Sequence, residues 1–329
     1  MRIGVLGAGS WGTTLASLVA PRHDTVLWAR DPEVAKSVTV DHVNPKYLPG
    51  FDLPVELSAT PLIGEAAGDA DLLVIGVPTS GFRCVLEEAV EYIRHWIPIV
   101  SLSKGLERGS LLRMTEVIRE VIPGHPVAAL TGPNIAWEIM AGKAAAAVIA
   151  TDDLEVANAI QAVFTRGVFR VYLNDDVVGC EMGGALKNVI AIATGIGEGL
   201  GVGDNTRAAV MSRGLAELTR LGVAMGAQPA TFAGLAGMGD LIVTCMSPYG
   251  RNRAVGEQLG RGRALEEVLG EMHMVAEGVN TASVALELAE RHHLDLPICA
   301  MINRVVNGEL GPLEAYRGLT PPGRETDPC

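Results

Sequence analysis

The sequence predicts an α/β domain with a mostly parallel sheet over residues 1–178, followed by an all-α domain over residues 179–320. Three observations predict this fold class. Short apolar runs alternate with helix-length amphipathic stretches in the first part of the chain. A glycine-rich turn follows the first run. Beyond residue 178, Ala, Leu and Gly dominate and runs of strand length become scarce.

The first part of the chain alternates between strand-like and helix-like segments. The strand-like runs are residues 2–7, 25–30, 71–78, 97–103, 127–132, 144–150 and 168–173. The helix-like stretches between several of them are residues 13–20, 85–93, 111–122 and 152–164. This alternation is typical of βαβ units, in which helices join parallel strands.

The second part has helical spacing of its apolar residues at 206–226, 263–272 and 281–293. The chain has 329 residues, which is long for one core and suits two domains. Residues 321–329 are polar and Pro-rich, so we expect a flexible tail there.

Composition narrows the class of protein. Hydrophobic residues make up 48% and charged residues 19% of the chain, as in globular proteins. No apolar run approaches the ~20 residues that a membrane span needs. The N-terminus has one positive charge and lacks the apolar run of a signal peptide. We therefore expect a cytoplasmic protein.

Charge and cysteine content exclude several kinds of site. The formal net charge is −12 and no basic cluster stands out, which argues against nucleic-acid binding. The five cysteines are odd in number and form no C-x-x-C pair, so reduced, mostly buried thiols are expected rather than disulfides or zinc. The histidines are scattered, and His292 and His293 suit the end of a helix. No metal is predicted.

The stretch "GAGSWG" places Gly7, Gly9 and Gly12 in the pattern G-x-G-x-x-G. The pattern alone is weak, but here it follows a strand-like run and opens a helix-like stretch, as a dinucleotide-binding Rossmann fold requires. Gly7 permits the tight turn, Gly9 lets the backbone approach a pyrophosphate, and Gly12 permits close helix–strand packing. The helix N-terminus then favours the anion.

The residues after the second strand bear on the choice of cofactor. An acidic side chain there commonly binds the ribose 2′-hydroxyl of NAD, and an arginine accommodates the 2′-phosphate of NADP. This chain has Arg30 followed by Asp31, so Arg30 favours NADP and Asp31 keeps NAD open. Ordinary turn chemistry is an equal alternative for Asp31.

Lys187 lies inside the apolar run "GGALKNVIAIATGIG". Lysine is rarely buried without a partner. Desolvation disfavours the charged form of a lysine, and a lysine tuned in this way can move protons. A lysine paired with a carboxylate for purely structural reasons remains an equal alternative.

Other polar residues favour the proton-moving role. The glycine-dense segment 234–256 holds Asp240, Thr244, Arg251 and Asn252. Asp240 is a candidate partner for Lys187 or for a substrate hydroxyl. Arg251 offers a planar fork for phosphate or carboxylate, although a solvated surface cation is the alternative.

Two loops of the first part add further candidates. Lys104 follows a predicted strand, and ligands of open α/β sheets bind beyond the carboxyl ends of strands. The loop "TGPNIAWEI" similarly places Gly132 and Asn134 after a strand. Together these residues suit alcohol oxidation, in which a cofactor carries the hydride and a base removes the hydroxyl proton.

The motifs resemble those of the bacterial-type NAD(P)-dependent glycerol-3-phosphate dehydrogenases over residues 2–318. The similar segments are "GAGSWGTTLA", "NPKYLPG", "SLSKGLE", "TGPNIAWEI", "GGALKNVIAIATGIGEGLG", "GMGDLIVTCMSPYGRNRAVG" and "MVAEGVNTA". "GALKNVIAIATG" is the most specific. The resemblance implies reversible NAD(P)-linked reduction of dihydroxyacetone phosphate to sn-glycerol 3-phosphate for phospholipid synthesis. It also implies a Rossmann domain, a helical domain and a homodimer.

The resemblance also implies roles for individual residues. Lys187 matches the proton acceptor, with Lys104 and Asp240 beside it in the catalytic set. The residues implied to bind substrate are Lys104, Gly132, Asn134, Lys187, Asp240, Thr244, Gly250, Arg251 and Asn252. The residues implied to bind cofactor, with the three glycines of the turn, are Ser10, Trp11, Arg30, Tyr47, Lys104, Ala136, Arg251, Val275 and Glu277.

This chain departs from the family at two substrate positions. It has Asn134 where the family usually has Ser or Thr, and Gly250 where the family often has Ser. Backbone N–H groups or the Asn134 amide would replace those hydroxyls.

Two other functions fit parts of the pattern. One is a related β-hydroxyacid dehydrogenase that acts on a carboxylate, against which the segment 237–252 argues by resemblance. The other is a non-catalytic NAD(P)-binding sensor, against which the intact set of Lys104, Lys187 and Asp240 argues.

Overall fold

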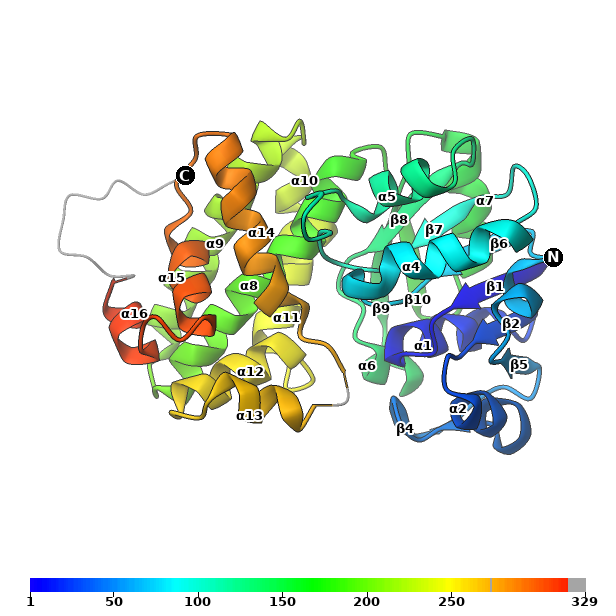
Figure 1. Cartoon of the computed structure of the whole chain (residues 1–329), viewed down its shortest axis with the longest axis horizontal. Helices are drawn as coiled ribbons and strands as arrows, with labels where there is room; N and C mark the ends of the chain where they lie inside the picture. The colour runs from blue at the N-terminus through cyan, green and yellow to red at the C-terminus, as the bar shows by residue number, and fades with distance from the viewer. Residues whose placement is uncertain (273, 319–329) are drawn as a thin grey trace. The chain divides into compact units, whose positions relative to one another are not determined.

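A computed structural model describes residues 1–272 and 274–318 of the chain. The chain folds into two compact units (Figure 1). The first contains residues 1–104 and 112–177, and the second contains residues 105–111 and the described residues from 178 onward. The predicted tail at 321–329 lies outside the described residues.

The first unit is built on an eight-stranded sheet with the order β10-β9-β8-β7-β6-β1-β2-β5. The strands are β1 (Arg2–Leu6), β2 (Asp24–Trp28), β5 (Leu57–Thr60), β6 (Leu72–Ile75), β7 (Ile99–Ser101), β8 (Val127–Thr131), β9 (Ala145–Ala150) and β10 (Phe169–Asn174). Every neighbouring pair is parallel except β8 with β9. The prediction of a mostly parallel sheet is therefore confirmed.

Helices cover both faces of this sheet. Successive residues of a strand point to opposite faces, and both faces carry apolar side chains that the helices bury. The helices are α1 (Ser10–Val19), α2 (Pro32–Lys36), α3 (Ile63–Ala67), α4 (Thr79–Ala89), α5 (Met114–Val121), α6 (Ala136–Met140) and α7 (Leu154–Phe164). Val5 of β1 packs in the core with α1, α2, α6 and α7. Its neighbour Leu6 packs in the core with α3, α4 and α5.

The sequence did not predict three short strands. These are β3 (Val43–Asn44), β4 (Leu48–Asp52) and β5. The first two form a separate antiparallel pair, whereas β5 is an edge strand of the main sheet. The Thr39 hydroxyl accepts from Ala59 N and donates to Ala59 O, at 2.8 and 2.9 Å. This side chain therefore occupies polar groups at the edge that another strand would otherwise use.

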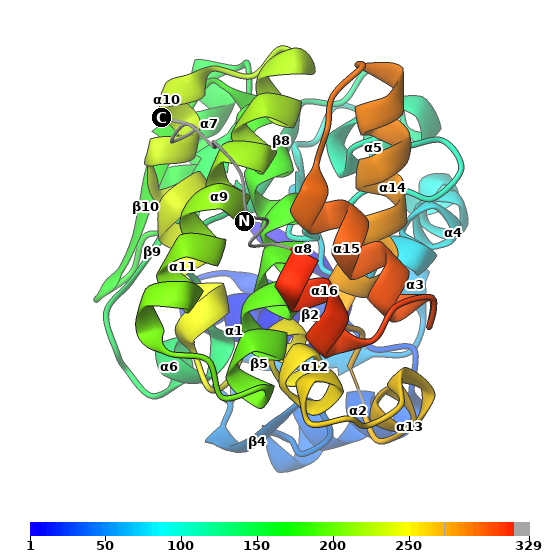
Figure 2. The same cartoon turned by 90° about the vertical axis from the view of Figure 1, so that its left-hand side faces the viewer.

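The second unit is helical, and none of its described residues forms a strand. Its helices are α8 (Val177–Gly199), α9 (Asp204–Ala224), α10 (Pro229–Ala233), η3 (Leu235–Gly239), α11 (Asp240–Met246), α12 (Arg251–Gly260), α13 (Leu265–Gly270), α14 (Glu277–Arg291), α15 (Pro297–Val306) and α16 (Pro312–Gly318), labelled for the most part in Figure 2. The predicted helical texture is confirmed.

Helix α8 is the central element of this unit. It has 23 residues and is apolar enough to cross a membrane by length and composition, so the expectation that no run approaches that length is wrong. However, 94% of its most apolar window is buried inside the protein. Helices of the second unit pack around it, and its apolar side chains form much of that unit's core.

Residues 105–111 belong to the helical unit although they lie in sequence between β7 and α5. Leu106 and Leu111 are 2% and 3% exposed and contribute to the core of that unit. Leu111 has a left-handed backbone with φ 65°, and α5 starts only at Met114, after Arg113 caps it. The predicted helix over 111–122 therefore begins three residues too early.

The described cysteines form no disulfide. Cys180, Cys245 and Cys299 are buried and Cys84 is exposed. The expectation of reduced, mostly buried thiols is confirmed for these residues. Cys329 lies outside the described part of the chain.

Candidate functional site

The glycine turn connects β1 to α1 as the motif requires. Gly7 has φ 120°, and a Cβ on it would lie 2.7 Å from the Gly76 carbonyl oxygen. A Cβ on Gly12 would lie 2.0 Å from the Gly7 carbonyl oxygen, which no side chain tolerates. A Cβ on Gly9 would meet nothing within 4 Å. The backbone at Gly9 is therefore open to an approaching phosphate group.

The N-terminus of α1 suits a dinucleotide pyrophosphate. Gly9 is its N-cap and supplies no side-chain acceptor, so the first N–H groups of the helix stay available to a ligand. Trp11 Nε1 is buried and has no hydrogen-bond partner among the described residues. Such an orphaned donor fits a site that a polar ligand completes. These observations are compatible with a bound NAD(P).

Asn44, the last residue of β3, fixes the turn between β3 and β4 against the glycine turn. Its side chain is fully buried. Nδ2 donates to the Ala8 carbonyl at 2.9 Å and to Thr13 Oγ1 at 2.8 Å. Oδ1 accepts from Tyr47 N at 3.2 Å. Tyr47 is thereby held beside the dinucleotide motif. Sequence reasoning missed this role of Asn44, although the residue begins the segment "NPKYLPG".

Arg30 and Asp31, the two residues proposed to select the cofactor, both follow β2 but differ in their contacts. Arg30 is exposed. Asp31 is the N-cap of α2 and accepts from Glu33 N at 3.1 Å and from Lys46 Nζ at 2.8 Å. The hydrogen bond from Lys46 lowers the pKa of Asp31. Asp31 thus performs turn chemistry, which was one of the two roles expected for it.

Lys104, Gly132 and Asn134 come together in the first unit. Lys104 Nζ donates to the Gly132 carbonyl at 2.9 Å and to Asn134 Oδ1 at 2.7 Å. Asn134 Nδ2 is buried and has no partner among the residues described. Gly132 has φ 110°, which explains why glycine follows β8. The Asn134 amide can therefore donate to a ligand where the resemblance implies a hydroxyl.

Lys187, Asp240 and Thr244 form one buried cluster in the helical unit. Lys187 is 4% exposed and pairs directly with the Asp240 carboxylate, which is 1% exposed. Lys187 Nζ also donates to Thr244 Oγ1 at 2.8 Å, and that hydroxyl donates to the Asp240 carbonyl at 2.6 Å. Of the two roles considered for Asp240, the structure shows the pairing with Lys187.

Glycine allows this cluster to form. A Cβ on Gly183, one turn before Lys187 on α8, would lie 2.6 Å from the Ala236 carbonyl oxygen of η3. Close contact between α8 and η3 therefore requires glycine at this position. Asp240 begins α11 directly after η3, and this approach brings its carboxylate to Lys187.

Cys245 lies near the cluster, close enough for its thiol to interact with the charges of Lys187 and Asp240. It is 1% exposed, and burial raises the pKa of its thiol to about 11. The thiol is therefore neutral at physiological pH and adds no charge beside Lys187 and Asp240. Sequence reasoning did not single out Cys245, because a buried cysteine looks the same in any core.

Helix α12 begins with Arg251 and Asn252. Its N-cap is Gly250, which supplies no side-chain acceptor, so the N-terminal N–H groups remain available. A Cβ on Gly250 would lie 2.8 Å from the Thr244 carbonyl oxygen, so the serine that the resemblance implies at this position would require the backbone to move. Arg251 Nη1 donates to the Val275 carbonyl at 3.0 Å.

Asn252 connects three helices rather than standing free for a ligand. Its Nδ2 donates to Asn188 Oδ1 at 3.0 Å, and its Oδ1 accepts from Gly278 N at 3.0 Å. Asn188 follows Lys187 on α8, and Glu277 and Gly278 begin α14. Sequence reasoning missed Asn188, although a buried amide beside Lys187 in an apolar run was a usable signal.

The structure groups the predicted residues within each unit. In the first unit, the glycine turn with Ser10 and Trp11 opens α1, and Ala136 opens α6 after the Lys104 cluster. In the helical unit, Arg251 contacts Val275, and its charge interacts with that of Glu277. The polar chemistry of that unit therefore gathers around α8, α11, α12 and the start of α14.

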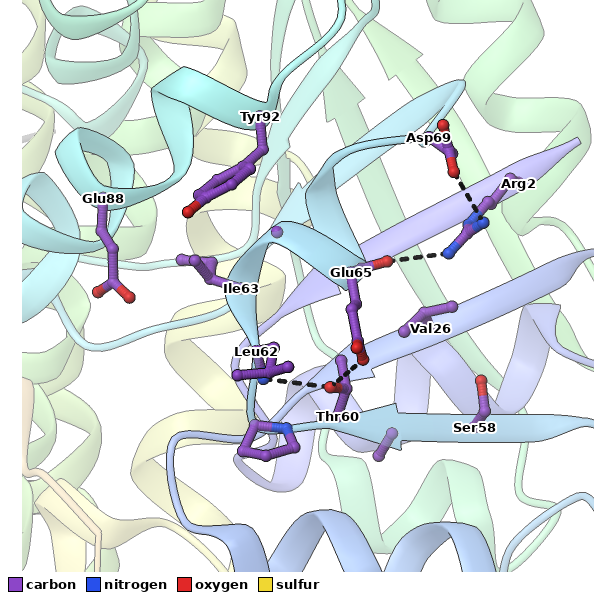
Figure 3. Close-up of a pocket in the computed structure, with 13 residues that line it drawn as sticks. Arg2, Val26, Ser58, Thr60, Leu62, Ile63, Glu65, Asp69, Glu88 and Tyr92 are labelled. Carbon is purple, nitrogen blue, oxygen red and sulfur yellow. Dashed lines mark hydrogen bonds and ion pairs between the residues drawn. The ribbon is translucent and has the colours of Figure 1, made fainter.

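A separate pocket in the first unit contains none of the predicted residues. It has a volume of about 880 Å³ and is lined by residues of β2, β5, α3 and the segment around Tyr92 (Figure 3). Thr60 Oγ1 donates to Glu65, and Arg2 donates to the Glu65 carbonyl. Glu65, Asp69 and Glu88 give it an acidic lining that disfavours phosphorylated ligands. It is not the candidate site.

Comparison with known families identifies both units. Residues 2–157 match the family described as NAD-dependent glycerol-3-phosphate dehydrogenase N-terminus, and residues 176–317 match its C-terminus. A protein of Sphingopyxis alaskensis named glycerol-3-phosphate dehydrogenase [NAD(P)+] 2 is 54% identical over 319 residues, which is 97% of this chain and 96% of that protein.

Two further relatives agree. A Mycobacterium avium protein named glycerol-3-phosphate dehydrogenase [NAD(P)+] is 51% identical over 328 residues, covering 98% of this chain and 96% of its own. The crystal structure of glycerol-3-phosphate dehydrogenase from Coxiella burnetii superposes with a TM-score of 0.93 at 34% identity, covering 97% and 98% of the two chains. The chain therefore belongs to the NAD-dependent glycerol-3-phosphate dehydrogenase family of oxidoreductases.

Proposed function

We propose that this chain catalyses the reversible reduction of dihydroxyacetone phosphate to sn-glycerol 3-phosphate, with NAD(P)H as hydride donor. The observation that carries the proposal is the buried cluster of Lys187, Asp240 and Thr244 in a chain of this family. The product would supply the backbone of phospholipids, and the enzyme would act as a homodimer in the cytoplasm.

Lys187 moves the proton in this mechanism. When bound, NAD(P)H supplies the hydride to the carbonyl carbon. The Lys187 ammonium donates its proton to the carbonyl oxygen as the alkoxide forms, and in oxidation the neutral amine accepts the hydroxyl proton. Asp240 stabilises the ammonium form, and Thr244 fixes the direction of Nζ.

The phosphate of the substrate would bind at the N-terminus of α12. Free backbone N–H groups and the Arg251 guanidinium both favour a phosphate group there. Asn252 aligns this helix with α8 through Asn188, so the phosphate and Lys187 keep a fixed relation. Binding energy from the phosphate then orients the reacting carbon.

Lys104 and Asn134 would bind the substrate from the first unit. Lys104 is already held by Gly132 and Asn134, and Asn134 Nδ2 remains as an unused donor. The residues that would contact the cofactor are the turn glycines Gly7, Gly9 and Gly12 with Ser10, Trp11, Arg30, Tyr47, Lys104, Ala136, Arg251, Val275 and Glu277.

The test is steady-state oxidation of NADH and of NADPH, followed at the nicotinamide absorbance with and without dihydroxyacetone phosphate. We expect oxidation that depends on this substrate. The proposal would be refuted by a protein that binds the cofactor but does not oxidise it when dihydroxyacetone phosphate is added. Oxidation only with a carboxylate substrate would also refute it.

A further inference from the structure

The carboxylate at the end of β2 is already engaged. In many dinucleotide-binding folds an acidic residue at this point binds the ribose 2′-hydroxyl. Here the Asp31 carboxylate accepts from Glu33 N at the start of α2 and from Lys46 Nζ. A ribose hydroxyl would compete with both of these donors. Asp31 is therefore poorly suited to select NADH.

Two basic residues, Arg30 and Lys46, lie next to Asp31. Arg30 directly precedes Asp31 and is exposed. Lys46 Nζ lies 2.8 Å from Asp31, yet 43% of the Lys46 side chain remains exposed. Ion pairs this exposed are weak, so Lys46 can share its ammonium with a second anion at small cost. The end of β2 thus presents Arg30 and Lys46 to an incoming anionic group.

Lys46 is held in this place by the turn to which it belongs. The fully buried Asn44 side chain connects the Ala8 carbonyl and the Thr13 hydroxyl of the dinucleotide motif to the backbone of Tyr47. Lys46 lies between these two anchored residues. Its position relative to the glycine turn is therefore built into the core of the unit.

We propose that Lys46, held by Asp31 and positioned by Asn44, binds the adenosine 2′-phosphate of NADPH together with Arg30 and makes this chain prefer NADPH to NADH. This inference rests on the proposed function, because it concerns the cofactor of that same site. A phosphate monoester carries a charge of about −1.5 to −2 at neutral pH. Two cations favour it even with Asp31 nearby, whereas the neutral 2′-hydroxyl of NADH gains little from them.

The test measures binding of cofactors to the full chain without substrate. The Kd values of NADPH and NADH are obtained from nicotinamide fluorescence, and those of adenosine 2′,5′-bisphosphate and AMP from calorimetry. We expect wild type to bind NADPH more tightly than NADH. Lys46→Gln should raise the Kd of NADPH and of the bisphosphate about tenfold, the effect of one charge-assisted hydrogen bond. The Kd values of NADH and AMP should not change.

Lys36→Gln is the matched control, because it removes the same charge from an exposed lysine of α2. It should leave the NADPH Kd unchanged. Equal losses in Lys36→Gln and Lys46→Gln, or equal losses for NADPH and NADH in Lys46→Gln, would overturn the inference. Wild type that binds both cofactors equally would also overturn it.

Asp31→Asn separates the two roles of Asp31, since asparagine caps a helix as well as aspartate does. Loss of the negative charge should tighten NADPH binding and leave NADH binding unchanged. Weaker NADH binding would show that Asp31 holds the ribose hydroxyl, which contradicts the inference. These binding results do not depend on turnover, so failure of the reductase reaction would refute the proposed function alone.

Discussion

Lys187 illustrates how a single residue connects the sequence to the chemistry. A charge inside an apolar run requires a partner, and the structure supplies Asp240, 53 positions along the chain. Removing one member of a buried pair usually costs about 3–5 kcal/mol, because it leaves the other charge without compensation. Two apolar side chains of similar volume would often give equal or greater stability at this position. The presence of a charged pair therefore favours a role in proton transfer over a purely structural one.

At this scale, the sequence predicted the charged residues better than the amides. Lys187, Asp240 and Arg251 stand out because their charges are unusual in apolar or glycine-rich segments. Asn188 lies beside Lys187 and Asn44 begins the segment "NPKYLPG", but neither position reveals which distant residues the amide contacts. Such pairings depend on the tertiary fold and have no local pattern.

Arg251→Ala should raise the KM for dihydroxyacetone phosphate at least about tenfold, because a charge-assisted contact to the phosphate is lost. The effect on kcat should be smaller. Arg261→Ala is the matched control, because Arg261 is exposed at the other end of α12 and pairs only with Glu257 among the contacts that the structure gives it. Steady-state kinetics at saturating cofactor measure both. Unchanged KM in Arg251→Ala would place the phosphate elsewhere.

At the scale of elements, helix α15 begins against a buried carboxylate. Glu217 of α9 is 2% exposed and accepts from Ile298 N at 2.7 Å and Cys299 N at 3.2 Å. It thereby satisfies two N–H groups at the start of α15 that the helix itself leaves unpaired. Burial raises the pKa of Glu217 above its ordinary value of 4.5.

This raised pKa gives a signed prediction for stability. A carboxyl whose pKa is higher in the folded state binds its proton more tightly there, so its contribution falls as pH rises from 4.5 through the folded value. The free energy of unfolding of wild type, minus that of Glu217→Gln, should therefore decrease over this range. The decrease should be about 1.4 kcal/mol per unit of pKa elevation. Urea titrations at several pH values measure it, and a difference that grows with pH would contradict the assignment.

The strands were predicted from sequence where they are buried and apolar, and missed where they are short and exposed. All strand-like runs of the first part form strands of the sheet. By contrast, β4 contains Pro49 and Gly50, and β5 is partly exposed at the sheet edge. Their strand conformation depends on pairing with neighbours and on Thr39 rather than on local propensity.

At the scale of the whole molecule, the chain passes between its two units at more than one point. Residues 105–111 leave the first unit and contribute Leu106 and Leu111 to the helical core before the chain returns at Leu112. No composition change marks this excursion in the sequence. A seven-residue loop with two leucines looks like an ordinary connection until its contacts are known.

Leu106→Ala should therefore destabilise the helical unit, by about 2–5 kcal/mol as for other buried leucines. All four tryptophans, Trp11, Trp28, Trp96 and Trp137, lie in the first unit, so their fluorescence reports on that unit. Circular dichroism at the helical band reports mainly on α8 to α16. In urea titrations, we expect Leu106→Ala to lower the midpoint of the dichroism transition more than that of the fluorescence transition.

Leu102→Ala is the matched comparison, because Leu102 is equally buried but belongs to the core of the first unit. Its larger effect should be on the fluorescence transition. If Leu106→Ala acted chiefly on fluorescence instead, residues 105–111 would belong energetically to the first unit.

The central claim is that Lys187 carries the proton in an NAD(P)-linked reduction of dihydroxyacetone phosphate. The most direct measurement is kcat of Lys187→Met for this reaction at saturating NADPH, together with the NADPH Kd and melting temperature of the same protein. Loss of a general acid–base group should lower kcat about 10²–10⁴-fold while the NADPH Kd is retained and the variant still melts cooperatively. A folded Lys187→Met protein with wild-type kcat would contradict the account and make the buried lysine a structural residue.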